Sequence, residues 1–172
     1  MNTPQYPKSG GQTDRRALIA MTATIDHQGD LNALIDGTHA SNFFFYPNPA
    51  NNVAGTYIRF DFGVDAHKLI TEATLYQDVY REQGIWQWQG SDNGTDWTNI
   101  GANFTLGCPY GTTVQIQTEL HGNTNRYRYY QLLGISGTTD GTSYELELDF
   151  KIDGYEVDFE DVFILPLMQI TM

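Results

Sequence analysis

Short runs in which apolar and polar residues alternate recur along this chain of 172 residues. In the run from Tyr144 to Ile152, leucine, phenylalanine and isoleucine fall on one face of an extended strand and charged residues fall on the other. The same period-two pattern predicts strands over residues 56–62, 73–79, 85–89, 114–120, 127–133 and 144–152. Residues typical of turns separate these runs. The pattern therefore predicts an all-β chain with almost no helix, folded as an antiparallel jelly-roll β-sandwich.

Two tight hairpins are predicted from the residues between alternating runs. Asn93–Gly94 follows a strand that places Trp86 and Trp88 on one face, and this dipeptide suits a hairpin turn. Trp97 would begin the return strand, and we expect all three tryptophans to pack in the core. Asp153–Gly154, in KIDGYEVDF, predicts a second hairpin in the same way.

Composition narrows the range of partners. Nine Lys and Arg residues against 21 Asp and Glu residues give a formal net charge of −12, so a nucleic-acid backbone is not an expected partner. Cys108 is the only cysteine, which excludes an internal disulfide and a structural thiolate metal site. No run is long enough for a membrane span. The opening residues also lack a secretory signal pattern, so we expect synthesis in the cytoplasm without a signal peptide.

The two ends of the chain differ from its middle. Residues 1–16 are polar and slightly basic and predict an N-terminal arm, residues 17–152 predict the sandwich, and residues 153–172 predict an extra strand with an apolar anchoring tail. We expect both ends to be held against the sandwich or a neighbouring chain. Glu145 and Glu147 lie two apart on one strand face, which predicts an exposed, solubilising surface.

The chemistry-bearing residues do not form a catalytic pattern. The chain has no metalloprotease histidine pair, no nucleophile elbow and no phosphate-binding glycine loop. The four histidines are scattered singly, and we expect surface or loop positions for them: His27, His39, His67 and His121. These observations predict a protein that is not an enzyme.

Six segments stand out for their order along the chain between residues 34 and 150: LIDGTHAS, TYIRFDFG, LITEATLYQD, WQGSDNGTDW, RYRYYQLLG and YELELDF. In this order they resemble the discoidin or coagulation-factor type C domain, within the galactose-binding-like superfamily of carbohydrate-binding modules. The resemblance implies an eight-stranded jelly roll that binds ligands with loops at one end, and it implies that Trp97 is a core tryptophan.

The resemblance also implies a structural calcium ion. By the family pattern, its ligands would be Asp36, Thr38 and Ser41, completed by Glu145 from the last core strand. Carboxylate, carbonyl and hydroxyl oxygens of this kind suit a hard cation. Thr38 stands where the family has Asp or Asn, and Ser41 stands where it has Thr. The other interpretation is that Asp36 and Gly37 only form a turn.

A glycan site is implied at the same end of the sandwich. Aromatic rings and amides supply the stacking and hydrogen bonding that a sugar needs, and the candidate contacts are Phe43, Phe44, Tyr46, Asn48, Tyr80, Arg81 and Tyr110. Galactose-binding relatives have Trp-His where this chain has Phe43–Phe44. The aromatic loop would serve an apolar protein contact equally well.

Together these features predict a non-catalytic, carbohydrate-binding structural or adhesion component of an assembled particle. A bacteriophage virion protein fits best, as a capsid decoration, head fibre or tail protein on the virion surface. It would contact cell-surface or environmental glycans through its loops and other particle subunits through both termini, and we expect it to form an oligomer or part of an assembly. Two alternatives stay open: a lectin module accessory to a glycoside hydrolase, and an architectural subunit with no ligand.

Overall fold

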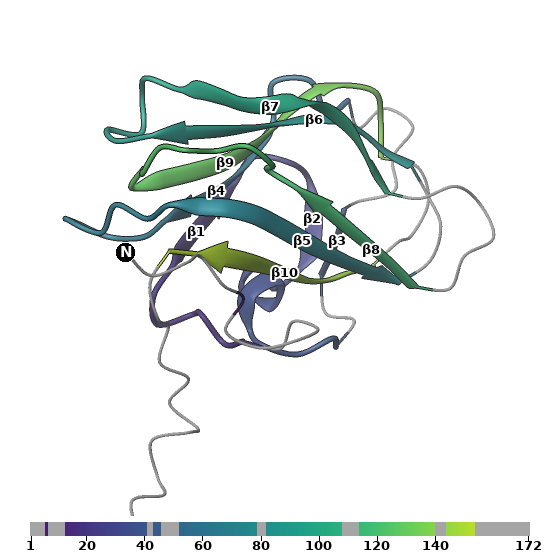
Figure 1. Cartoon of the computed structure of the whole chain (residues 1–172). Coiled ribbons are helices and arrows are strands. Elements are labelled where there is room, and N and C mark those ends of the chain that lie inside the picture. The colour runs from purple at the N-terminus through teal and green to yellow at the C-terminus, as the bar shows by residue number, and fades with distance from the viewer. Residues whose placement is uncertain are drawn as a thin grey trace, which may run out of the picture.

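Two five-stranded sheets face each other in the computed structural model of the chain (Figure 1). The structure describes residues 6, 13–40, 43–45, 52–78, 82–107, 114–139 and 144–153, and it describes only the backbone of residues 78, 82, 114–119 and 144–146. The first sheet has the order β1 (Ala20–Ala23), β4 (Tyr57–Asp61), β9 (Tyr129–Ser136), β6 (Glu82–Ser91) and β7 (Thr98–Gly107). The second has the order β2 (His27–Gly29), β3 (Phe43–Phe45), β10 (Tyr144–Ile152), β5 (Ile70–Asp78) and β8 (Val114–Glu119).

The predicted class is confirmed, because every strand pairing between these elements is antiparallel. β10 has the predicted bounds, and the other predicted strands overlap β4, β5, β6, β8 and β9. The helical content of the described residues is one 3₁₀ turn, η1 (Leu31–Ile35). The short strands β1, β2 and β3 have three or four residues each, too few for alternation to reveal them. With them the described sandwich has ten strands rather than the eight that the resemblance implied.

Large aromatic side chains fill the space between the sheets. Trp86 and Trp88 are 0% and 2% exposed, as predicted. Phe60 of the first sheet meets Phe150 of the second edge-to-face at 5.2 Å between ring centroids, and it also lies 6.0 Å from Trp88. Aromatic pairs of this geometry add to the stabilisation from burial. The apolar face predicted for β10 is therefore the face that holds the two sheets together.

A turn does connect β6 and β7 at Asn93–Gly94, but it is the six-residue segment 92–97 rather than the tight hairpin turn predicted. The Asn93 side chain accepts hydrogen bonds from the backbone N–H groups of Thr95 and Asp96 at 2.9 and 2.8 Å. Gly94 has a φ of 73°, a left-handed conformation that glycine adopts without strain. Asn93 thus fixes the turn with its own side chain, and Gly94 supplies the backbone conformation.

Trp97, by contrast, does not enter the core. Its ring is partly exposed, and the Arg59 guanidinium carbon lies 4.6 Å from the ring centroid. Trp88 pairs with Ile100, which is buried, so even-numbered positions at this end of β7 lie on the side of the sheet that Ile100 faces. Trp97 is one residue out of phase with them and points to the outer face, which corrects the prediction of a third core tryptophan.

Both ends of the chain lie largely outside the described residues, including the predicted hairpin beyond Asp153 and the apolar tail. The described part of the predicted arm lies against the second sheet: Thr13 and Arg15 are 4% and 0% exposed. Within the described residues, no helix is long and apolar enough to cross a membrane. The predicted domain boundaries at 16 and 153 stay predictions.

Candidate functional site

The candidate glycan-binding loops connect strand ends that lie at one end of the sandwich. In the second sheet, Tyr144 at the start of β10 pairs with Asp78 at the end of β5, and Asp78 pairs with Val114 at the start of β8. In the first sheet, the start of β6 pairs with the end of β7, through Glu82 and Gly107. The chain connects these strand ends from β5 to β6 and from β7 to β8, and β10 follows β9, whose last residue Ser136 pairs with Ile85 near the start of β6. Three loops that are distant from one another in the sequence therefore start and finish at the same end of the sandwich.

The aromatic residues of β3 divide between the core and the outer face. Phe43 is 0% exposed and packs against Phe45 and His27 at 5.7 and 4.9 Å between ring centroids. A ring without an exposed face cannot stack on a sugar, so Phe43 is corrected from a candidate glycan contact to a core residue. Phe44 points the opposite way because side chains alternate along a strand, and it is partly exposed.

The remaining candidate glycan contacts lie outside the described residues. They are Tyr46, Asn48, Tyr80, Arg81 and Tyr110. Their roles stay predictions that rest on the resemblance and on the position of the flanking strand ends.

The loop predicted to bind calcium is folded around an aspartate. One oxygen of Asp36 accepts hydrogen bonds from both the backbone N–H and the hydroxyl of Thr38, each at 2.9 Å. Among the described residues, no group of three or more His, Cys, Asp or Glu side chains is arranged to hold a metal ion. Ser41 and the Glu145 side chain lie outside the described part. The predicted calcium ligand set therefore stays a prediction.

Glu147 is the described carboxylate that reaches this loop from β10. One of its oxygens accepts a hydrogen bond from the Thr13 backbone N–H at 3.2 Å, and the His39 Nε2 lies 2.9 Å from the other oxygen. The His39 ring also stacks on Tyr76 at 4.6 Å between ring centroids. An imidazole and a backbone amide therefore lie against the glutamate beside the predicted calcium loop.

A second carboxylate on the same strand face is paired with an arginine from the N-terminal segment. Arg15 forms an ion pair with Asp149 and also donates to the Phe150 carbonyl at 3.3 Å. Arg15 and Asp149 are 0% and 1% exposed. Burial raises the pKa of Asp149 above its usual range, and the charge and hydrogen bond of Arg15 act in the opposite direction. The ion pair therefore compensates an otherwise costly buried charge.

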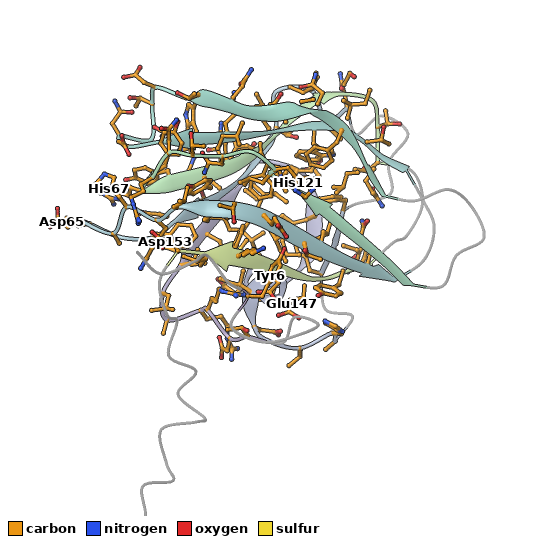
Figure 2. The ribbon with its side chains drawn as sticks, viewed as in Figure 1. Tyr6, Asp65, His67, His121, Glu147 and Asp153 are labelled. Atoms are coloured by element: carbon orange, nitrogen blue, oxygen red, sulfur yellow. The ribbon has the colours of Figure 1, made fainter. Side chains whose placement is uncertain are left out.

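The polar face of β10 is thus buried at Glu147 and Asp149, while Lys151 on the same face is partly exposed, and this corrects the prediction that Glu147 lies on an exposed, solubilising surface. Glu147 is 0% exposed, and Figure 2 shows it with Tyr6 in the layer of the second sheet. The Tyr6 hydroxyl lies 2.6 Å from the Thr74 hydroxyl on β5, and burial raises the pKa of Tyr6 to about 12. The one sequence signal for this arrangement is the basic character of the N-terminal segment, opposite in sign to the carboxylates of β10.

The fold can now be compared with known proteins. No family model and no curated protein matches the chain. Among solved structures, the family 32 carbohydrate-binding module from NanJ of Clostridium perfringens, in complex with galactose, superposes with a TM-score of 0.57 at 13% identity, covering 87% of this chain and 98% of the module. The chain has the discoidin-like fold of these modules. The resemblance inferred from the six ordered segments is confirmed at the level of the fold.

Two further solved structures have the same fold as this chain. An F5/8 type C domain from Bacteroides fragilis has a TM-score of 0.56 at 12% identity, covering 87% of this chain and 100% of the domain. The C-terminal domain of a chitobiase from the same organism has a TM-score of 0.53 at 19% identity, covering 81% of this chain and 97% of the domain. The sandwich thus corresponds to nearly the whole of each module, although few residues are identical.

Proposed function

We propose that this protein is a non-catalytic carbohydrate-binding module whose ligand loops lie at the end of the sandwich where β5 and β7 end and β6, β8 and β10 begin. The observation that carries the proposal is the discoidin-like fold, together with the convergence of three candidate loops at that end. The superposed module from Clostridium perfringens was solved in complex with galactose, and in many folds ligands bind where loops from separate strands meet.

The proposed sugar contacts combine aromatic faces with polar groups. Sugar rings stack on aromatic side chains, while amide and guanidinium groups donate to the hydroxyls. The residues that would do this are Phe44, Tyr46, Asn48, Tyr80, Arg81 and Tyr110. Phe43 is left out because it is buried.

A glycan array with the purified full chain tests the proposal. We expect saturable binding to a defined group of glycans and a loss of at least about tenfold in affinity, which is about 1.4 kcal/mol, in Arg81→Ala and Tyr110→Ala. Arg16→Ala is a matched control, because Arg16 is exposed and, among the described residues, its side chain bonds only to Asp14 on its own segment. Binding that is equally weak in all variants, or absent in the natural chain, would support the architectural alternative.

Calcium binding is proposed as a separate property of the loop around Asp36. An ion that binds the native state raises the unfolding midpoint by mass action. Calorimetric unfolding with calcium and with chelator should therefore give a higher midpoint with calcium, and Asp36→Ala should remove the difference. Asp26→Asn changes an exposed aspartate elsewhere and should leave it intact. An equal midpoint in calcium and chelator would rule out a structural calcium ion.

We further propose that the module belongs to an assembled particle, with a bacteriophage virion surface as the specific case. The support is the contrast between the basic N-terminal segment and the acidic segment 145–161, followed by the apolar residues 162–165 and 167–168. An apolar segment of this kind needs a covering surface. Light scattering of the full chain should give an oligomer whose mass falls on introducing Phe163→Asp with Leu165→Asp. A monomer of unchanged mass in both chains would contradict the assembly.

A further inference from the structure

A row of polar side chains crosses the outer face of the first sheet, at right angles to the strands. Arg59 pairs with Gln131, Gln131 pairs with Gln89 and Gln89 pairs with Asn99, so the four residues lie opposite one another on β4, β9, β6 and β7. Gln131 donates to the Gln89 carbonyl oxygen at 2.7 Å, and Gln89 donates to the Asn99 carbonyl oxygen at 2.7 Å. Each amide is oriented by its neighbour, which gives the row a fixed direction.

Two aromatic rings enclose the guanidinium at one end of this row. The Arg59 guanidinium carbon lies 4.5 Å from the Tyr57 ring centroid and 4.6 Å from the Trp97 ring centroid. Arg59 also donates through Nε and one terminal nitrogen to the Gln131 side-chain oxygen, at 3.3 and 3.1 Å. All three stacked residues are partly exposed, while Gln131 beneath them is 4% exposed. The charged group is therefore held in one orientation and still meets solvent.

The charge of Arg59 has no carboxylate partner among the described residues. Five other described cations each pair with a carboxylate: Arg15, Arg16, Arg126, Arg128 and Lys151. Arg59 instead donates to a neutral amide, and two of its five N–H donors are used in doing so. In a chain of net charge −12, a fixed and uncompensated guanidinium on an open sheet is a specific point of attraction for an anion.

We propose that this face binds an acidic sugar, with the sugar carboxylate on Arg59 and the sugar ring against Trp97. A guanidinium binds a carboxylate with paired, charge-assisted hydrogen bonds. Indole and phenol rings offer surfaces to the C–H groups of a sugar, and the outer amides of Gln89 and Asn99 offer donors and acceptors to its hydroxyls. The inference rests on the proposed carbohydrate-binding function and adds a ligand class and a second surface, on a sheet face rather than at the loops.

The experiment compares one saccharide with and without its charge. Oligogalacturonate and its fully methyl-esterified counterpart have the same rings, and only the first carries carboxylates. Titration calorimetry at low salt should show the full chain binding the acid at least about tenfold more tightly than the ester, and this preference should weaken with added salt because the attraction is electrostatic.

Three variants of the sheet face and one control elsewhere assign the binding to the face. Arg59→Gln should remove the preference for the acid, and Trp97→Ala should weaken binding of both saccharides. Lys68→Gln is the charge-matched control, because Lys68 is the other described cation with no carboxylate partner among the described residues. The Lys68→Gln variant should prefer the acid over the ester as strongly as the natural chain does. Arg59→Lys keeps the charge without the planar fork and should give an intermediate preference, which separates recognition from a general loss of charge.

The loop variant Arg81→Ala distinguishes this proposal from the proposed function. If Arg81→Ala abolishes binding of the acid while Arg59→Gln and Trp97→Ala retain it, the sheet-face site is wrong and the loop site stands. If Arg59→Gln and Trp97→Ala abolish it and Arg81→Ala does not, the sheet face is the site. The acidic-sugar proposal is overturned if the natural chain binds the acid and the ester equally. It is also overturned if the only change in the Arg59→Gln chain is a lower oligomeric mass.

Discussion

The two outer faces of the sandwich differ in how far their polar and charged side chains are exposed to solvent. On the second sheet, Glu147 and Asp149 are covered by the N-terminal segment and are 0% and 1% exposed. On the first sheet, Tyr57, Arg59 and Asp61 remain partly exposed. Both sets come from strands with the same alternation. The comparison teaches that alternation identifies two faces of a strand, while a segment distant in the sequence determines whether the outer face meets water.

The difference also changes the energetics of charge. Buried ions must be compensated by close partners, because their hydration has been lost, whereas exposed ions interact through water and contribute little. The covered face therefore depends on the Arg15–Asp149 pair for its stability. The open face can retain an uncompensated Arg59, and this freedom is what makes the open face a candidate for ligand recognition.

The largest expected effect is at the covered face. Replacing Arg15 by Met leaves Asp149 buried without its counter-charge, and we expect a loss of about 3–5 kcal/mol in the free energy of unfolding. Denaturant unfolding of the purified full chain measures this loss. Arg16→Met is the matched control, since Arg16 pairs with Asp14 at the surface, and it should have little measurable effect on the free energy of unfolding. Equal losses in the two variants would contradict the compensating role of Arg15.

The pH dependence of the Arg15→Met loss sharpens this prediction. Burial already raises the pKa of Asp149, and without Arg15 the pKa should rise further. A group whose pKa is raised in the folded state stabilises the fold at low pH and loses this contribution as the pH rises through the folded pKa. The difference between Arg15→Met and the natural chain should therefore shrink as the pH falls. Asp149→Asn combined with Arg15→Met should recover part of the loss at neutral pH and remove most of this pH dependence.

A smaller effect is expected for the tryptophan on the open face. Trp97→Ala removes a partly exposed ring and its stack with Arg59, so we expect a loss of about 0.5–1 kcal/mol in the free energy of unfolding. Trp88→Ala, at 2% exposure, should cost about 3–5 kcal/mol because it leaves a cavity. Thermal and denaturant unfolding of both variants tests the contrast. Similar losses would mean that Trp97 is a structural residue after all.

The smallest effect is expected for the ion pair between Arg128 and Asp61, whose side chains are 25% and 27% exposed. Hydrogen bonds from Arg128 lower the pKa of Asp61 below its usual range. A lowered carboxylate pKa stabilises the fold above the unfolded pKa and loses this contribution as the pH falls through the folded value. Arg128→Gln should thus have only a small effect on the free energy of unfolding near neutral pH, and the difference from the natural chain should shrink as the pH falls below about 4. A difference that grows in acid would contradict the assignment.

The sequence identified most of the fold because its signals are local. The alternation in TYIRFDF and YELELDFKI gave β4 and β10, and Asn93–Gly94 gave the turn between β6 and β7. These patterns depend on neighbours within a few residues, which strand geometry and turn chemistry fix directly. The six ordered segments also identified the fold that the solved structures confirm.

Sequence reasoning predicted less of the candidate site. It named Asp36 and Thr38, which the structure brings into one turn, but it placed Phe43 on a ligand surface and Glu147 on an exposed face. The prediction for Phe43 was wrong because a run of aromatic residues does not reveal which of them point inward. The prediction for Glu147 was wrong because the segment that covers Glu147 lies more than one hundred residues away in the chain. Thr13 of that segment donates a hydrogen bond to Glu147.

By itself, then, the sequence determined six of the ten described strands, the position of the turn between β6 and β7 and the identity of the inner face of β10, since each of these follows from local patterns. Only the tertiary structure decided which strands became neighbours, and therefore that Arg59, Gln131, Gln89 and Asn99 form one row. Only the tertiary structure also covered Asp149 with Arg15. Both arrangements join residues that are distant in the chain, and their contacts exist only after the sheets have packed and excluded water between the segments.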